Sequence, residues 1–92
     1  MNYTKISKLG FVLASKYRMK VVIQLRFSPM TPKLISKRTG IRIGHISKVL
    51  TDLAKEDIVR CVNPKTKKGR IYVLTELGEW IAERIEKIKS CL

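Results

Sequence analysis

Residues 31–40, TPKLISKRTG, constrain the fold more tightly than any other segment because they mark both ends of one short helix. Thr31 followed by Pro32 is a strong start signal, since a threonine hydroxyl caps free backbone N–H groups and proline fits the first helical position. Gly40 readily takes the left-handed conformation that often ends a helix. The segment therefore predicts a helix over about residues 32–39.

A second helix is expected to begin a few residues later, near Arg42, and to run to about Lys55. With 3.6 residues per turn, one face of this helix is apolar and the other is polar and mostly uncharged or basic. The apolar face is formed by Ile43, Ile46, Leu50, Leu53 and Ala54. Two short helices joined by a tight turn that contains glycine predict a helix-turn-helix over about residues 31–55.

Two short runs rich in Val, Ile and Tyr follow, over 58–62 and 70–74, and predict a β-hairpin. Asp57 is expected to end the preceding helix because aspartate tolerates the left-handed conformation, and Pro64 and Gly69 favour a turn at the hairpin tip. Thr75 is the expected N-cap of a last helix over about residues 75–91. A hairpin directly after a helix-turn-helix is a winged helix, with its wing over about residues 58–74.

The first part of the chain predicts two more helices. Asn2 or Thr4 is the expected cap of a helix that runs through Ala14, and Ser15 is the expected cap of a helix over about 16–27. The apolar side chains expected to face inward are Ile6, Leu9, Val12, Leu13, Met19, Val22, Ile23 and Phe27. The predicted fold is thus mainly α with a small β-hairpin: one winged helix-turn-helix domain over residues 1–92, with N- and C-terminal flanking helices.

Charge is distributed unevenly along the 92 residues, which carry 20 Lys and Arg against 7 Asp and Glu, a net charge of +13. Residues 1–51 contain eleven basic residues and no acid, hence +11, whereas nine basic and seven acidic residues give 52–92 a charge of +2. The predicted hairpin tip, NPKTKKGR at 63–70, adds four cations without an acid. A one-sided positive field of this kind suits a polyanion such as DNA or RNA.

The longest apolar run near the N-terminus, residues 9–14, is too short for the core of a signal peptide or for a membrane span. The sequence therefore predicts no membrane partner. We expect a cytoplasmic protein that is associated with the nucleoid when it is bound to DNA.

Residues 13–78 resemble winged-helix transcriptional regulators of the ArsR and MarR kind, especially small archaeal ones. TPKLISKRTGIRIGHISKVLTDLAKEDIV (31–59) looks like their helix-turn-helix, NPKTKKGRIYVLTELGE (63–79) like their wing, and SKYRMKVVIQL (15–25) like the helix beneath. The sequence departs from their pattern at Arg42, where a small hydroxyl cap is common, and at Asp57, where glycine is common. The resemblance implies a homodimer that binds specific sites on double-stranded DNA. The Cys-rich motif of metal sensors is missing, so no metal sensor is expected.

The exposed face of the second helix in the helix-turn-helix supplies the residues expected at base edges, because each base pair shows a distinct pattern in the major groove. These residues are Arg42, Gly44, His45, Ser47, Lys48 and Thr51. Contacts to the DNA backbone, which give affinity and register but little sequence information, are expected in two groups. The helix-turn-helix contributes Thr31, Lys33, Lys37, Arg38 and Lys55, and the wing contributes Lys65, Lys67, Lys68 and Arg70.

The last helix carries an apolar stripe whose first residues complete the core of one chain. Its distal part is expected to pack, with the first helix, against a second chain through Ile85, Ile88 and Leu92. Cys91 is either a free thiol near the chain end or an intersubunit disulfide, if two such helices cross near a two-fold axis. Cys61 is interpreted as a small buried strand residue.

Several other functions bear on this interpretation. One alternative is a non-specific architectural DNA-binding protein, and another is an RNA- or protein-binding winged helix within a larger complex. An enzyme is not expected, because the chain has one histidine, no nucleophile-and-base set and no glycine-rich phosphate loop. The cysteines have no metal-ligand spacing, so no metal or cofactor is expected, and no residue set indicates a pocket for a small-molecule effector.

Overall fold

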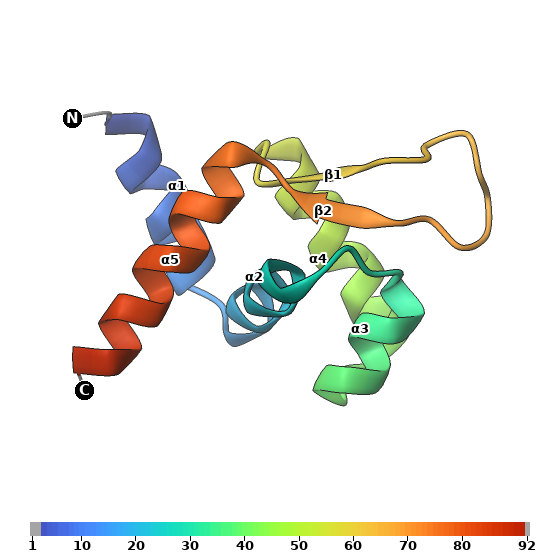
Figure 1. The fold of residues 1–92 in the computed structure, drawn as a ribbon, viewed down its shortest axis with the longest axis horizontal. Coiled ribbons are helices and arrows are strands. Elements are labelled where there is room, and N and C mark those ends of the chain that lie inside the picture. The colour runs from blue at the N-terminus through green and yellow to red at the C-terminus, as the bar shows by residue number, and fades with distance from the viewer. Residues whose placement is uncertain (1–2, 92) are drawn as a thin grey trace.

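Residues 3–91, which the computed structural model describes, form five helices and one antiparallel pair of strands (Figure 1). In chain order these are α1 (Tyr3–Leu13), α2 (Lys16–Phe27), α3 (Pro32–Thr39), α4 (Ile43–Lys55), β1 (Val59–Cys61), β2 (Tyr72–Leu74) and α5 (Glu76–Cys91). The predicted class, mainly α with a hairpin between the fourth and fifth helices, is confirmed. Side chains are described for residues 4–90.

Short polar side chains fix the helix starts where the sequence predicts them. The hydroxyl oxygens of Ser15 and Thr31 accept hydrogen bonds from the backbone N–H groups three residues further on, at 3.3 and 3.2 Å. Thr75 caps α5 in the same way, accepting from the N–H of Gly78 at 3.1 Å. Gly40 ends α3 with φ at 77°, and Asp57 has φ at 61° after α4, so both predicted left-handed residues are confirmed. Thr4 lies inside α1, and Asn2 lies outside the described residues.

The two strands of the hairpin are shorter than the runs 58–62 and 70–74 suggest. Val59 lies opposite Leu74, and Cys61 lies opposite Tyr72. Beyond Cys61 the pairing is incomplete. The N–H of Val62 still donates to the carbonyl oxygen of Ile71, at 2.9 Å, but the N–H of Ile71 donates to the side-chain oxygen of Asn63, at 2.8 Å. On the other edge of β2, Met30 forms two backbone hydrogen bonds with Tyr72, of 3.1 and 2.9 Å, so the linker before α3 is attached to the base of the wing.

The core is built around α2, which packs against α1, α3, α4, α5 and β2. Because five elements surround it, its buried residues are Val21, Val22 and Leu25, and the predicted inward residue Phe27 is 72% exposed at the end of the helix. Four other residues that were predicted to lie in the core are also exposed: Ile6, Leu13, Ile43 and Ala54. Val49, which was not assigned to the apolar face of α4, is buried.

One close contact positions α5 against the hairpin. Gly78, in the first turn of α5, is buried directly beside the backbone of Ile58, and a Cβ atom at this position would overlap the carbonyl oxygen of Ile58. The N–H of Thr75 donates to the same carbonyl oxygen at 3.0 Å. A side chain as small as alanine therefore does not fit between α5 and the start of β1.

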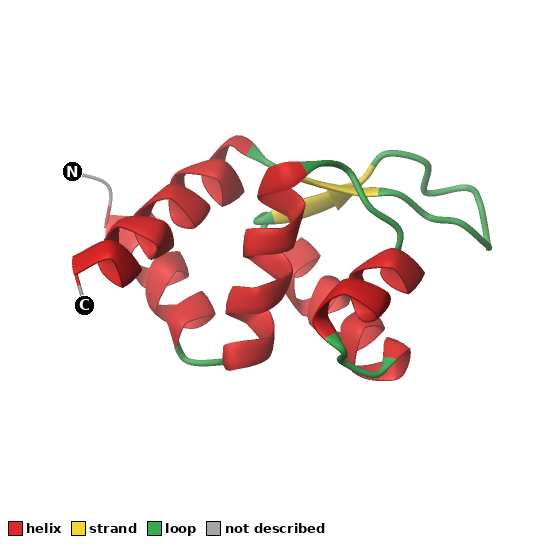
Figure 2. Cartoon of the chain, turned by 60° about the horizontal axis from the view of Figure 1, so that its bottom comes forward, coloured by secondary structure: helices red, strands yellow, loops and turns green. Residues whose placement is uncertain are grey.

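The long loop of the wing extends away from the helical body, and α1 and α5 lie at the opposite end of the molecule (Figures 1 and 2). None of the helices within residues 3–91 combines the length and apolar composition that a membrane-spanning helix requires.

Candidate nucleic-acid interface

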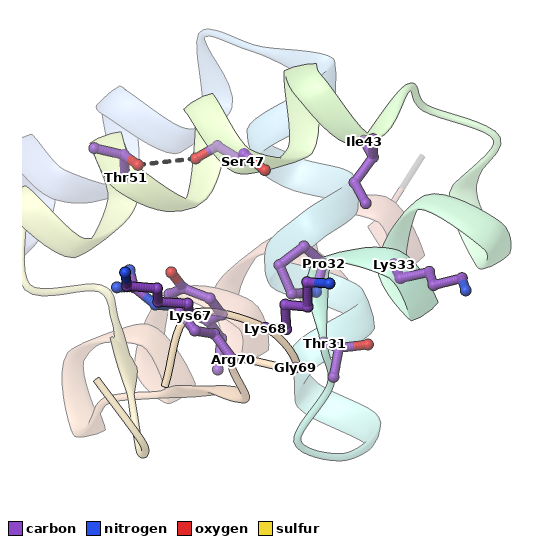
Figure 3. Close-up of a pocket in the computed structure, with 11 residues that line it drawn as sticks. Thr31, Pro32, Lys33, Ile43, Ser47, Thr51, Lys67, Lys68, Gly69 and Arg70 are labelled. Carbon is purple, nitrogen blue, oxygen red and sulfur yellow. Dashed lines mark hydrogen bonds between the residues drawn. The ribbon is translucent and has the colours of Figure 1, made fainter. Parts of the chain in front are cut away.

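A groove of about 600 Å³ runs between the helix-turn-helix and the wing (Figure 3). It is lined by three segments that are distant in sequence: the start of α3, one face of α4 and the wing. Of the described residues that line it, four are cationic and none is acidic. The lining residues are Thr31, Pro32, Lys33, Ile43, Ser47, Thr51, Lys67, Lys68, Gly69, Arg70 and Tyr72.

The face of α4 that lines the groove is a stripe of residues four apart: Ile43, Ser47 and Thr51. In Figure 3 these side chains are carried by α4 on the side that faces the wing. The hydroxyl of Thr51 donates to the carbonyl oxygen of Ser47 at 2.9 Å, which leaves its lone pairs as acceptors. The stripe therefore presents an apolar side chain and two hydroxyl groups, and no charge.

The other predicted base-contacting residues lie outside the groove. Gly44 is exposed, with open space where a side chain would project. His45 is exposed and its ring lies 5.6 Å from that of Tyr17 in α2, between centroids. The ammonium group of Lys48 lies 3.2 Å from the Asp52 carboxylate, an exposed ion pair of the kind that contributes little to stability. Arg42 precedes α4, and its side chain makes no capping hydrogen bond.

The predicted backbone-contacting residues divide into two groups. Thr31 and Lys33 line the groove together with Lys67, Lys68 and Arg70, whereas Lys37, Arg38, Lys55 and the exposed Lys65 do not line it. Arg38 instead lies beside a smaller pocket with Lys20 of α2 and Lys89 of α5. The separation follows from helix geometry: Thr31 and Arg38 are seven residues apart, about 10 Å along α3.

Asn63 organises the wing loop, a role that sequence reasoning missed. Its side-chain oxygen accepts from the N–H of Ile71, and its side-chain NH2 group donates to the carbonyl oxygen of Gly69 at 3.2 Å. Its backbone carbonyl oxygen accepts from the N–H of Thr66 at 3.1 Å. The Nε of Arg70 donates to the carbonyl oxygen of Thr66 at 2.8 Å. The Asn-Pro pair at residues 63–64 was the available signal, since asparagine in a turn commonly bonds to nearby backbone.

Replacing Asn63 by alanine is expected to loosen the wing loop without changing the charge. The half-buried N–H of Ile71 loses its acceptor, so stability should fall by about 1–2 kcal/mol. Urea denaturation measures this loss, and amide exchange at Ile71 should become faster. Thr66→Ala is the matched control, because only backbone groups of Thr66 bond within the loop. Equal stability and equal exchange in the two variants would contradict this role of Asn63.

Of the described residues that were predicted to contact a second chain, one is buried and one is exposed. Ile85 is 1% exposed and packs in the core of its own chain, because α5 lies against α2 and α1 along its length, so its assignment to an intersubunit contact is wrong. Ile88 is 41% exposed. Leu92 and the side chain of Cys91 lie outside the described residues. Cys61 is half-buried, and its thiol lies 3.4 Å from the side-chain oxygen of Asn63.

In the part of the chain for which side chains are described, no group of three or more His, Cys, Asp and Glu residues is arranged to hold a metal ion. Four cationic side chains and the hydroxyl groups of threonine and serine surround one groove, and this is the composition of a site for phosphate oxygens.

The fold is similar to those of several solved bacterial proteins. ZitR from Lactococcus lactis aligns with a TM-score of 0.71 over 79% of this chain at 15% identity, and the transcriptional repressor BigR from Xylella fastidiosa with a TM-score of 0.74 over 90% at 21% identity. The homodimeric winged helix-turn-helix DNA-binding domain Mb0332 from Mycobacterium bovis aligns with a TM-score of 0.70 over 95% at 19% identity.

The chain spans about half the length of ZitR, 51%, but 81% of BigR and 77% of the Mb0332 domain. No family model matches the sequence, and no curated protein matches it. At these identities the similarity concerns the fold, and it confirms the winged helix that the order of elements predicts.

Proposed function

We propose that this chain is a transcriptional regulator that binds specific sites on double-stranded DNA as a homodimer. In this proposal α4 enters the major groove, and the wing contacts the backbone and the adjacent minor groove. The observation that carries it is the shared groove, which one face of α4 and three wing cations, Lys67, Lys68 and Arg70, line together. The repressor BigR and the DNA-binding domain Mb0332, which have the same fold, support it.

The dimensions and charges of the site fit a duplex. An α-helix with its side chains is about 10–12 Å wide, and the major groove of B-DNA is about 12 Å wide. With α4 in that groove, Lys33, Lys67 and Lys68 lie beside the helix and supply cationic donors to the phosphates at the edge of the groove. Gly44, on the exposed face of α4, allows the helix backbone to approach the bases closely.

The surface proposed for dimerisation lies at the end of the molecule opposite the wing (Figure 1). Ile6, Gly10 and Leu13 of α1 are all exposed and recur at the spacing of one helix face, and Ile88 of α5 is exposed too. A second copy of the chain covers this apolar surface. The two α4 helices of such a dimer would read half-sites about one turn of DNA apart.

Sedimentation tests the dimer directly. The chain is expected to sediment as a dimer in the micromolar range, and Leu13→Glu, which places a charge in the apolar surface, is expected to yield monomers. Phe27→Glu is the matched control. Among residues 4–90 Phe27 is the most exposed large apolar residue, and it lies outside this surface, so the variant should remain dimeric. A wild-type chain that stays monomeric throughout this range would exclude the proposed dimer.

Selection from a random duplex pool at about 150 mM salt tests the proposed function as a whole. We expect a two-fold symmetric motif with half-sites about 10 base pairs apart, centre to centre. A pool that enriches no motif would instead support a non-specific architectural protein. Competition of the selected duplex with single-stranded and double-stranded RNA completes the test, because an RNA-binding winged helix would prefer the RNA competitors.

A further inference from the structure

Ile43 is a large apolar residue that lies on the surface of the groove and not in the core. It is the first residue of α4, and the helical period assigns it to the apolar face, yet it is 51% exposed. Its neighbours Ile41 and Ile46 are buried and fill the core beside it. In Figure 3 the Ile43 side chain points into the groove, towards Pro32 and Lys68.

The surroundings of Ile43 make it the apolar end of an otherwise polar stripe. Ser47 and Thr51 follow it along the groove with their hydroxyl groups. The charged groups of α4 lie elsewhere: Lys48 is paired with Asp52, outside the groove. Ile43 also stands at the N-terminal end of α4, the end from which a recognition helix reaches base edges.

Only one apolar group projects from base edges into the major groove, the C5-methyl group of thymine. A half-exposed isoleucine at this position gains from contact with that methyl group because both surfaces leave water. Guanine, cytosine and adenine present polar atoms to the same side chain and offer no such contact. We propose that Ile43 recognises a thymine in each half-site through its C5-methyl group. This inference rests on the proposed function and specifies the base that α4 prefers.

The test replaces each thymine of the selected duplex in turn by deoxyuridine, which removes the methyl group and keeps every hydrogen-bonding group. At one thymine per half-site, wild-type affinity is expected to fall about four-fold, the effect of one buried methyl group. With both half-sites substituted, the loss should reach roughly fifteen-fold. Fluorescence anisotropy with labelled duplexes measures these ratios at fixed salt.

Two variants tie the effect to Ile43. Ile43→Ala is expected to bind the thymine and uracil duplexes with equal affinity, whereas Ile43→Val, which keeps branched methyl groups, should retain most of the preference. Phe27→Ala is the matched control, since it removes an exposed apolar side chain that does not line the groove, and it should discriminate as the wild type does.

The outcomes separate this inference from the proposed function. An enriched motif in which no thymine is sensitive to uracil, or an Ile43→Ala variant that keeps the wild-type preference, overturns the role of Ile43 and leaves sequence-specific DNA binding intact. A pool without any enriched motif overturns specific binding and this inference with it.

Discussion

Replacing Lys67 and Lys68 by alanine is expected to weaken binding to every duplex about a thousandfold at 150 mM salt. Both lysines line the groove beside α4, and each is expected to neutralise one phosphate per protomer. A dimer thus loses four contacts, and the slope of log K against log salt should fall by about 3.6. Titrations at several salt concentrations measure both quantities, and the relative preference among sequences should stay unchanged.

The control for this variant has the same change in net charge at the other end of the molecule. Lys87 and Lys89 lie in the distal part of α5, away from the wing, and their double replacement by alanine should lower affinity far less (Figure 1). If the two double variants lost affinity equally, the effect would come from total charge, and the wing would have no special role in binding.

Gly78→Ala is expected to destabilise the fold by about 3 kcal/mol, a large value for the addition of one methyl group. The added Cβ overlaps the backbone oxygen of Ile58, and backbone cannot swing aside as the end of a flexible side chain can. To make room, α5 has to shift off the start of β1 and break the hydrogen bonds of Thr75, of 3.0 Å from its N–H to the carbonyl oxygen of Ile58 and of 2.6 Å from its hydroxyl to that of Asp57. For a domain of this size the melting temperature should fall by about 15 °C.

Gly44→Ala provides the opposite expectation for the same chemical change. A Cβ at Gly44 meets open space within α4, so alanine should stabilise the helix by up to about 1 kcal/mol. Thermal and urea unfolding of the two variants side by side would settle the point. If the Gly78→Ala protein were as stable as the Gly44→Ala protein, α5 would be able to move away from Ile58 without any decrease in the free energy of unfolding.

Local signals in the sequence were sufficient for the ends of the elements. The caps at Ser15, Thr31 and Thr75 and the left-handed residues Gly40 and Asp57 depend on backbone within a few residues of each, and all lie where expected. The order of elements then brings the wing to the side of α4 that lines the groove. These features follow from short-range chemistry and from topology, so they can be predicted without coordinates.

The faces of the helices were harder to predict because several elements compete to cover them. Periodicity assigns Phe27 and Ile43 to the core, but the core ends before it reaches either residue. The length of the last helix suggests that Ile85 contacts a second chain, but Ile85 is buried in the core of its own chain. The pairing of Met30 with Tyr72 joins two residues that no local pattern connects.

The pairing of Met30 with Tyr72 also determines what mutation can alter at the interface. Met30 directly precedes Thr31, the cap of α3, and Tyr72 begins β2 at the base of the wing. The gap between α3 and the wing is thus held by main-chain atoms, which every substitution except proline leaves in place. In the proposed complex, side-chain changes here alter how strongly a duplex is bound, while the spacing between the contacted phosphates stays constant. A duplex of different groove width therefore has to deform in order to bind.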